Sequence, residues 1–324
     1  MKTTILFALV AIVNVTAAFT GTAHVEERSF KQTIHREVAV TFDDLPVATP
    51  SIYSIEEQRT ITSKLVKSIV SNNVPAVGFV NESKLYRFGE VDARIALLKT
   101  WLDAGLELGN HTFSHPSLQT TPLADYEENV MRGETVTARL LNEKGMKLRY
   151  FRHPFLQVGT NLEVRQKFEK FLAERGYTIA PVTIDNGDYI FAAAYAKAER
   201  RGDKESMKRV VEAYLPYMEK VFEFYEQLSI DVCGYEIKQV FYIHANALNA
   251  ECFDALARMM KKRGYNFITL DQALKDNAYK MPDNHTGRAG TSWLHHWAEA
   301  KGMKIKNDPD IPQFVVGLSE FKEQ

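Results

Sequence analysis

Short runs of apolar and β-branched residues alternate along this chain with longer segments of helical periodicity, and glycine marks many of the junctions. Four of the predicted helices end just before Gly105, Gly145, Gly176 and Gly264. Glycine commonly closes a helix because it adopts positive φ without steric cost. Strands that follow helices in this order are typical of parallel strands joined by crossover helices, so the sequence predicts an α/β fold.

The individual elements follow from the same pattern. Strands are predicted at residues 38–42, 76–80, 107–109, 149–152, 179–184, 240–243 and 267–270. Helices are predicted at residues 55–70, 92–104, 124–143, 162–175 and 251–262. Seven such strands fit a barrel or a doubly wound sheet.

Two regions depart from this alternation. Residues 192–228 contain no strand pattern but have apolar residues at three- or four-residue steps, which predicts a helical insertion. The insertion either packs on the barrel or also forms a wall of the substrate groove. Residues 281–324 are predicted to be a C-terminal extension packed on the domain. We do not expect a metal site at His295 and His296 there, because adjacent histidines do not share a helical face.

Composition and charge narrow the possible partners. The chain has 324 residues, of which 45% are hydrophobic, and a formal charge of -1. A near-neutral chain gives no reason to expect nucleic acid or an anionic membrane surface as partner. A neutral substrate is easier to reconcile with this charge, and no obligate protein partner is implied.

The N-terminal residues resemble a secretory signal. Lys2 precedes a short apolar run that Asn14 ends, which predicts a signal peptide over residues 1–18, with cleavage as late as residue 23. The alternative is an uncleaved anchor; the chain is expected to be exported. Cys233 and Cys252 either pair or remain two buried thiols.

Polar residues gather where the predicted strands end. This is the edge at which barrels and open α/β sheets place their sites. Each cluster alone has an ordinary structural explanation, but five in order favour a functional site. The clusters are Asp43 and Asp44, His111 and His115, Arg152 with His153 and Pro154, Asp185 and Asp188, and His244.

The first two clusters together have the composition of a metal site with a base. One carboxylate and two imidazoles bind a divalent ion and leave coordination positions open, and the second carboxylate remains unbound. The pattern therefore predicts metal-assisted hydrolysis. Adjacent residues of an extended segment point to opposite sides. A division of labour between Asp43 and Asp44 therefore requires a bend after Phe42.

The clusters resemble the motifs of the polysaccharide deacetylase family, also called the NodB-homology domain or carbohydrate esterase family four, over residues 37–280. Residues 41–44 match Thr-Phe-Asp-Asp, residues 111–115 match His-(Ser/Thr)-x-x-His, and residues 152–155 match Arg-x-Pro-(Phe/Tyr). The fourth motif, Asp-x-x-Asp-Trp, has Tyr189 in place of Trp, and the fifth, Leu-x-His, has Tyr242 in place of Leu. The resemblance implies a distorted (β/α) barrel of about seven parallel strands with the helical insertion before the sixth.

The resemblance also implies roles for these residues. Asp44, His111 and His115 would bind a divalent metal, with zinc the expected ion, and Asp43 would be the general base. His244 would be the general acid, with Asp188 tuning its pKa, and Arg152 would position the base. The backbone N–H of Phe155, next to Pro154, would donate to the oxyanion, and Tyr189 and Tyr242 would contact substrate. His153 is a weaker candidate for the acid.

The expected reaction is removal of acetyl groups from a carbohydrate, with N-acetyl favoured over O-acetyl. The two tyrosine substitutions predict a changed preference for the acyl group or the sugar. Two alternatives stay open: a glycan-binding protein without turnover, and a deacylase of a small amide that is not a sugar. A pure binding module has no need of a general acid opposite a metal, which argues against the first alternative.

Overall fold

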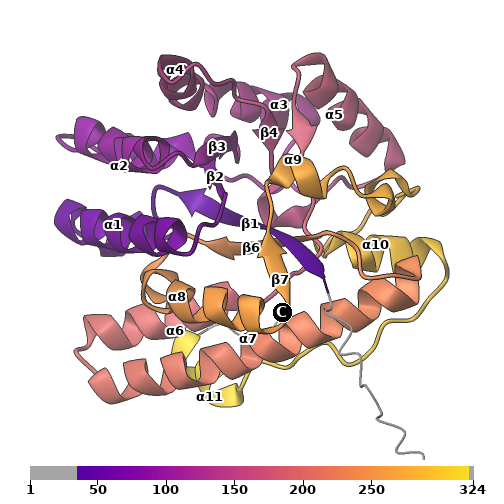
Figure 1. Cartoon of the computed structure of the whole chain (residues 1–324). Helices are drawn as coiled ribbons and strands as arrows, with labels where there is room; N and C mark the ends of the chain where they lie inside the picture. The colour runs from indigo at the N-terminus through magenta and orange to yellow at the C-terminus, as the bar shows by residue number, and fades with distance from the viewer. Residues whose placement is uncertain (1–34, 321–324) are drawn as a thin grey trace, which may run out of the picture. The chain divides into compact units, whose positions relative to one another are not determined.

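The computed structural model describes residues 35–320, so the predicted signal peptide lies outside the described residues. Seven strands are present: β1 (Arg36–Leu45), β2 (Val77–Val80), β3 (Glu107–Asn110), β4 (Tyr150–Phe151), β5 (Thr178–Ile179), β6 (Gln239–His244) and β7 (Tyr265–Phe267). All of their pairings are parallel. The α/β prediction is therefore confirmed (Figure 1).

The strands form a distorted barrel. The order along the sheet is β5-β4-β3-β2-β1-β6, and β7 pairs with the first residues of β1. The chain after β5 crosses to β6, where Ile184 bridges Phe241 and the Thr183 N–H donates to the Val240 carbonyl at 2.9 Å. This crossing joins the two ends of the sheet. The expected seven-stranded distorted barrel is confirmed, but residues 179–184 form strand only at their start.

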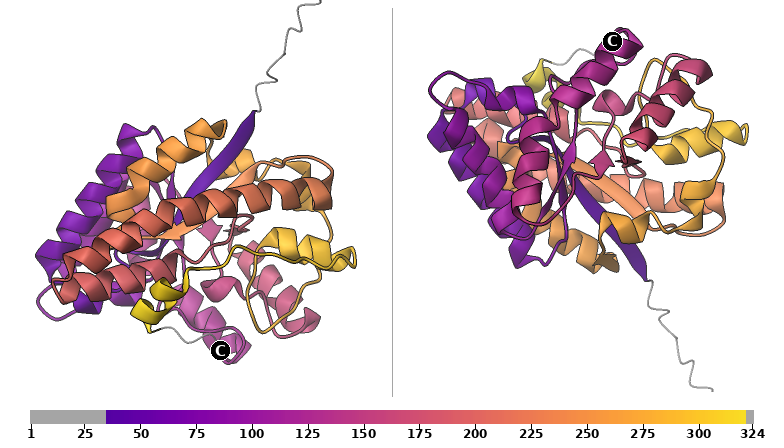
Figure 2. Two further views of the ribbon diagram at one scale, coloured as in Figure 1. Left: turned by 90° about the horizontal axis from the view of Figure 1, so that it is seen from below. Right: turned by 90° about the horizontal axis from the view of Figure 1, so that it is seen from above.

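Helices cover the outside of the barrel (Figure 2). They include α1 (Ile55–Ser71), α2 (Val91–Asp103), α3 (Leu123–Arg132), α4 (Thr135–Glu143), α5 (Leu162–Glu174), α8 (Ala247–Lys262) and α9 (Leu270–Ala273). Gly105, Gly145, Gly176 and Gly264 all have positive φ after helices, as predicted. Single-turn 3-10 helices lie at Pro50–Ile52, Glu82–Leu85, Pro154–Leu156 and Asn277–Lys280.

Two predicted elements are wrong in part. Residues 124–143 form two helices that break at Gly133, where a Cβ would lie 2.5 Å from the backbone of Thr112. The predicted strand at 267–270 ends at Phe267, because the Thr269 side chain caps α9 in a capping box with Gln272. In both places a contact or cap replaced the element that the apolar pattern predicted.

The helical insertion consists of α6 (Asp188–Arg200) and α7 (Lys204–Cys233), so it is longer at both ends than the predicted 192–228. The C-terminal extension contains α10 (Trp293–Ala300) and α11 (Gln313–Ser319). Helix α10 packs on α7, and α11 packs on α6. The insertion and the extension therefore form a second layer on one side of the barrel, with α7 as its long helix (Figure 1).

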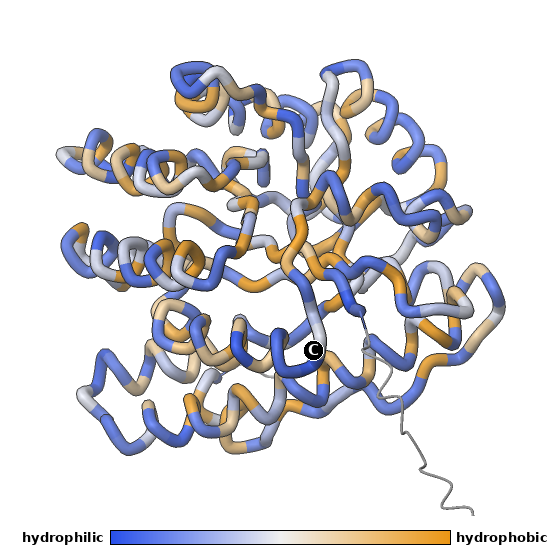
Figure 3. The backbone as a smooth tube through the Cα atoms, viewed as in Figure 1, coloured by the Kyte–Doolittle hydropathy of each residue, from blue (hydrophilic) through white to orange (hydrophobic). Residues whose placement is uncertain are grey.

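Apolar side chains fill the space between the strands and the helices. Phe42 of β1 packs edge-on against Trp101 of α2 and Phe253 of α8, with ring centroids 5.4 and 5.2 Å apart. Figure 3 shows the apolar positions gathered along the central strands, whereas the outer helices alternate between polar and apolar faces. Within residues 35–320, no helix combines the length and apolar character needed to cross a bilayer. Cys233 and Cys252 have free thiols.

Candidate active site

The bend that the sequence requires after Phe42 is present in β1. The pairing of β1 with β2 shifts register between Phe42 and Leu45, and Asp44 has a φ of 70°. The left-handed conformation of Asp44 turns its side chain out of the alternation, so that the two carboxylates approach the same site from different directions. Both lie inside β1, not after it, because the strand continues to Leu45.

Asp44, His111 and His115 form a cluster in which one ligand atom of each lies within 4.8 Å of the others. His111 follows β3, and its Nδ1 lies 2.8 Å from the Arg152 carbonyl oxygen. Because a carbonyl only accepts, Nδ1 carries the proton and the Nε2 lone pair remains available for a metal. Burial lowers the pKa of both histidines, which keeps them neutral, as metal ligands must be.

The carboxylate of the cluster is ionised. Burial opposes ionisation of Asp44, but the neighbouring Lys84 ammonium outweighs it and holds the pKa of Asp44 well below its usual range. Lys84 Nζ lies 3.1 Å from Asp44 Oδ1. One carboxylate with two neutral imidazoles is a donor set suited to a divalent ion such as zinc.

Asp43 lies beside this cluster, with its Oδ2 3.9 Å from His111 Nε2, but its ion-pair partner is Arg152. The Arg152 guanidinium is fully buried, and its Nη1 lies 3.3 Å from each oxygen of Asp43. Arg152 is fixed in turn by bonds to the Ala180 carbonyl (2.7 Å) and the Thr41 hydroxyl (3.0 Å). Burial raises the pKa of Asp43 to about 6, and Arg152 limits that rise. A carboxyl group with this pKa is ionised at neutral pH and able to accept a proton.

His244 is the last residue of β6 and pairs in register with Asp43 of β1. Its Nδ1 lies 2.7 Å from Oδ1 of Asp188, the first residue of α6. The other oxygen of Asp188, Oδ2, accepts hydrogen bonds from the backbone N–H of His244 (2.9 Å) and from Asn249 Nδ2 (2.8 Å). Burial disfavours the imidazolium, but Asp188 outweighs burial and raises the pKa of His244 to about 9. His244 is therefore held protonated at neutral pH.

The loop after β4 contacts the cluster at His115. Phe155 follows Pro154 and has a φ of 55°, and Leu156 has a φ of 54°. Phe155 is 54% exposed, and its ring packs edge-on against that of His115, with centroids 4.4 Å apart. His153 is buried against the rings of Phe151 and Phe168, and burial lowers its pKa to about 3. A histidine with this pKa is not a proton donor at neutral pH.

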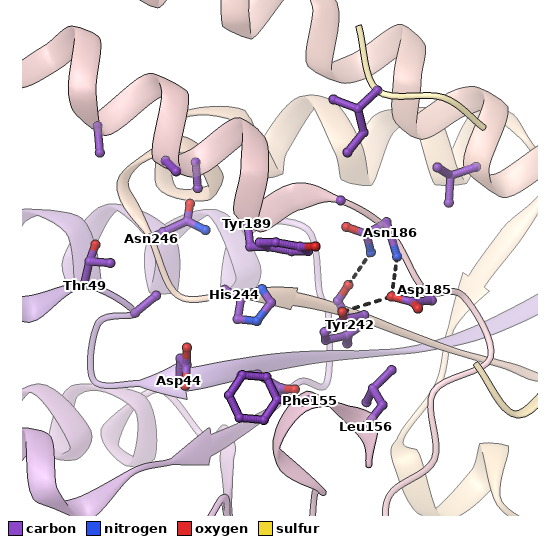
Figure 4. Close-up of a pocket in the computed structure, with 18 of the residues that line it drawn as sticks. Asp44, Thr49, Phe155, Leu156, Asp185, Asn186, Tyr189, Tyr242, His244 and Asn246 are labelled. Atoms are coloured by element: carbon purple, nitrogen blue, oxygen red, sulfur yellow. Dashed lines mark hydrogen bonds between the residues drawn. The ribbon is translucent and has the colours of Figure 1, made fainter. Parts of the chain in front are cut away.

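The two tyrosines that depart from the motifs both face the cavity. Tyr189 lies over His244, with ring centroids 6.3 Å apart (Figure 4). Tyr242 points inward, and its hydroxyl donates to Asp185 Oδ1 at 2.9 Å. Burial raises the pKa of Asp185. The floor of the cavity therefore carries a hydrogen-bonded pair of polar groups.

The cavity has a volume of about 1080 Å³ and extends beyond the motif residues. Sequence reasoning did not name several residues of its walls, because these residues lie in the insertion and the extension outside the five motifs. These walls include Ala192 and Ala196 of α6, Tyr217 and Tyr225 of α7, His295 of α10 and Ile311. The interpretation of the insertion as a wall of the groove agrees with this lining.

Parts of this chain are similar in sequence to known proteins. The family model described as polysaccharide deacetylase matches residues 30–177. A peptidoglycan-N-acetylglucosamine deacetylase of Bacillus cereus is 26% identical over 47% of this chain and 46% of its own length. A chitin deacetylase of Colletotrichum lindemuthianum is 27% identical over 47% of this chain and 52% of its own length. The chain thus spans about half the length of these curated relatives.

Solved structures give similar matches. A family 4 carbohydrate esterase from Streptomyces lividans in complex with acetate has a TM-score of 0.47 and 18% identity, covering 74% of this chain and 95% of that one. A CE4 family pseudoenzyme from Bacillus anthracis has a TM-score of 0.44 and 16% identity, covering 74% and 66%. The family model and the two curated relatives agree with the first three motifs, so residues 30–177 of this chain are similar to the polysaccharide deacetylase family.

Proposed function

We propose that this protein is a metal-dependent hydrolase that removes acetyl groups from a carbohydrate, with N-acetyl preferred over O-acetyl. One observation carries the proposal: the Asp44–His111–His115 cluster lines the same cavity as a carboxylate suited to accept a proton, Asp43, and an imidazolium suited to donate one, His244. A binding module has no use for such a matched pair. The same arrangement argues against a glycan-binding protein without turnover.

Asp44, His111 and His115 would hold the metal, which when bound supplies a Lewis acid that polarises the acyl carbonyl and acidifies water. Zinc is our expectation from the ligand set. Asp43, oriented by Arg152, takes the proton of the attacking water, a contribution of roughly 10²- to 10⁴-fold. His244, held as imidazolium by Asp188, gives its Nε2 proton to the departing nitrogen. The Phe155 N–H donates to the oxyanion that develops on the acyl oxygen.

The preference for N-acetyl groups rests on the acid. An amine leaves only when it is protonated, whereas an alkoxide leaves with less assistance, so a dedicated imidazolium favours amides. Both curated relatives are named for deacetylation of glycans, one of them expressly of N-acetylglucosamine. Tyr189 and Tyr242 would contact the sugar and the acyl group. We further propose export of the chain, as the N-terminal pattern predicts, without an obligate protein partner.

A second candidate is the deacylation of a compact amide that is not a sugar. The cavity supports it, because α6, α7 and the C-terminal extension add walls beyond the barrel rim. Its volume of about 1080 Å³ is at the upper end of small-molecule sites. Acetate release from small N-acetylated amides but from no oligosaccharide would establish this candidate in place of the first.

The decisive experiment is acetate release from N-acetylglucosamine oligomers and from an O-acetylated glycan, with and without a chelator. Asp43→Asn and His115→Ala should each lose at least about 100-fold in kcat, whereas His35→Ala, an exposed histidine outside the site, should match the parent. Full activity after complete metal removal, or in both site variants, would reject the proposal. Glycan binding without acetate release would establish the binding-protein alternative.

A further inference from the structure

The loop that carries the proposed oxyanion donor has an unfavourable backbone conformation. Phe155 and Leu156 are consecutive residues with positive φ, at 55° and 54°, and neither is glycine. Such conformations are unfavourable for residues with a side chain and persist only where the surroundings enforce them. Within the loop, the Leu156 N–H donates to the His153 carbonyl and the Gln157 N–H to the Pro154 carbonyl, both at 3.1 Å. Contacts from outside the loop must therefore help to hold this backbone conformation.

The C-terminal extension lies directly against this loop at Gly290. A Cβ placed on Gly290 would lie 2.6 Å from the Leu156 carbonyl carbon and 2.7 Å from that of Phe155, and closer still to the Phe155 carbonyl oxygen. Gly290 does not have positive φ, so its backbone would tolerate alanine. Glycine is therefore needed here for close approach alone.

Hydrogen bonds join the same two segments. Gln157 Nε2 donates to the Arg288 carbonyl at 3.1 Å, and its Oε1 accepts from the Ser117 hydroxyl at 2.7 Å. Gln119 Nε2 donates to the carbonyl oxygens of Gly287 (2.6 Å) and Gly159 (3.3 Å). These hydrogen bonds hold the extension at Gly287 and Arg288, just before the Gly290 contact.

The extension is itself anchored to the barrel. The Trp293 N–H donates to the Val182 carbonyl at 2.7 Å, and the Trp293 ring lies 6.5 Å from that of His153. Arg165 of α5 binds both oxygens of Asp283, each at 2.9 Å. The segment from Asp283 to Trp293 is therefore anchored at both ends, and it contacts the loop between these anchors.

We propose that Gly290 is a positioning residue of the active site, through which the C-terminal extension holds the Phe155–Leu156 peptide in the conformation that aims the Phe155 N–H at the acyl oxygen. The inference rests on the proposed function for its catalytic consequence. Figure 4 shows Phe155 and Tyr189 on opposite sides of His244, so a displaced loop would also alter the cavity. No motif contains Gly290, which also lies outside residues 30–177, the part of this chain that the family model matches.

The test compares Gly290→Ala with Gly317→Ala in the full chain, because Gly317 also lies in the extension but no atom surrounds its Cβ position. Hydrogen exchange at residues 153–157 should accelerate at least about tenfold in Gly290→Ala only. Loss of one oxyanion donor costs about 10²- to 10³-fold. We therefore expect kcat to fall by roughly 10- to 100-fold with KM nearly unchanged, the signature of a transition-state interaction.

Gln157→Ala provides a second variant that adds no volume, should Gly290→Ala fail to fold. It removes the bond to Arg288 and should shift exchange and kcat in the same direction, by a smaller factor. Exchange and kcat of Gly290→Ala equal to those of Gly317→Ala would overturn the inference, as would faster exchange spread evenly over the barrel. A parent protein that releases no acetate would defeat the proposed function alone, because the exchange measurement would still decide the positioning role.

Discussion

Nδ1 of His244 lies 2.7 Å from Oδ1 of Asp188, and this pair joins the last residue of β6 to the first residue of α6. The helix thereby places a buried carboxylate against the imidazole of His244, which lines the cavity. Asp188 is what raises the pKa of His244 to about 9. The relationship connects the helical insertion to the proposed chemistry, because α6 is the first helix of the insertion.

Replacement of this carboxylate should move the alkaline limit of activity. In Asp188→Asn the pKa of His244 falls, so the imidazolium is lost at lower pH, and the alkaline limb of the kcat profile should shift toward acid by at least about one unit. At pH 6 the loss should be smaller than at pH 8. An unchanged alkaline limb in a folded variant would show that His244 is not the acid. Asp231→Asn, an exposed substitution, is the control.

The acidic limit should respond to Arg152 in the opposite sense. Arg152 lowers the pKa of Asp43 against the effect of burial, so Arg152→Met should raise that pKa above its value of about 6. Since the base must be ionised, the acidic limb should move to higher pH, and activity at pH 7 should fall by about 100-fold.

Stability is the necessary control for this variant, because Asp43 then remains buried without its partner, at a cost of about 3–5 kcal/mol. The profile should therefore be recorded well below the melting temperature, with circular dichroism to verify folding. If the acidic limb of the Arg152→Met profile matched that of the parent, Asp43 would not be the base.

Metal binding should stabilise the fold independently of activity. A ligand that binds only the folded state stabilises it by about 2.7 kcal/mol at 100 times its Kd. Addition of ZnCl₂ to chelator-treated protein should therefore raise Tm by several degrees in calorimetry. His115→Ala should abolish most of that rise, whereas His35→Ala should retain it. Equal rises in both variants would place the metal elsewhere.

Tyr242 should set the preference among acyl groups. Tyr242→Leu removes the ring from the cavity floor, and a pocket that gains room for one methylene changes selectivity by about 10-fold or more. The ratio of kcat/KM for N-propionyl over N-acetyl substrate should rise accordingly. Tyr242→Phe keeps the volume and should leave the ratio unchanged, while the loss of the bond to Asp185 lowers stability by about 1–3 kcal/mol. Equal ratios in all three proteins would remove Tyr242 from the acyl pocket.

Much of the barrel could be predicted from the sequence because its signals are local. Glycines such as Gly105 and Gly264 close helices through their own φ, and the apolar runs of β1 and β6 are buried on both faces. The two failures had different origins, a local helix cap in one case and a contact between distant residues in the other. Thr269 competed with the strand pattern by capping a helix, and Gly133 broke a helix to admit the backbone of Thr112.

The sequence by itself determined which side chains could form the site, since the Asp pair, the His-x-x-x-His segment and His244 are readable from their spacing and their strand ends. Only the tertiary structure decided how these side chains are arranged in space. The positive φ of Asp44 separates it from Asp43, and the register of β6 on β1 places His244 beside Asp43.

The position of the C-terminal extension also could not be predicted from the sequence. Nothing near Gly290 in the chain indicates that it meets Phe155, because the two are far apart in sequence and the contact arises only when the extension packs on the barrel. Local patterns record backbone preference and burial, whereas a contact between distant segments depends on how the whole chain packs.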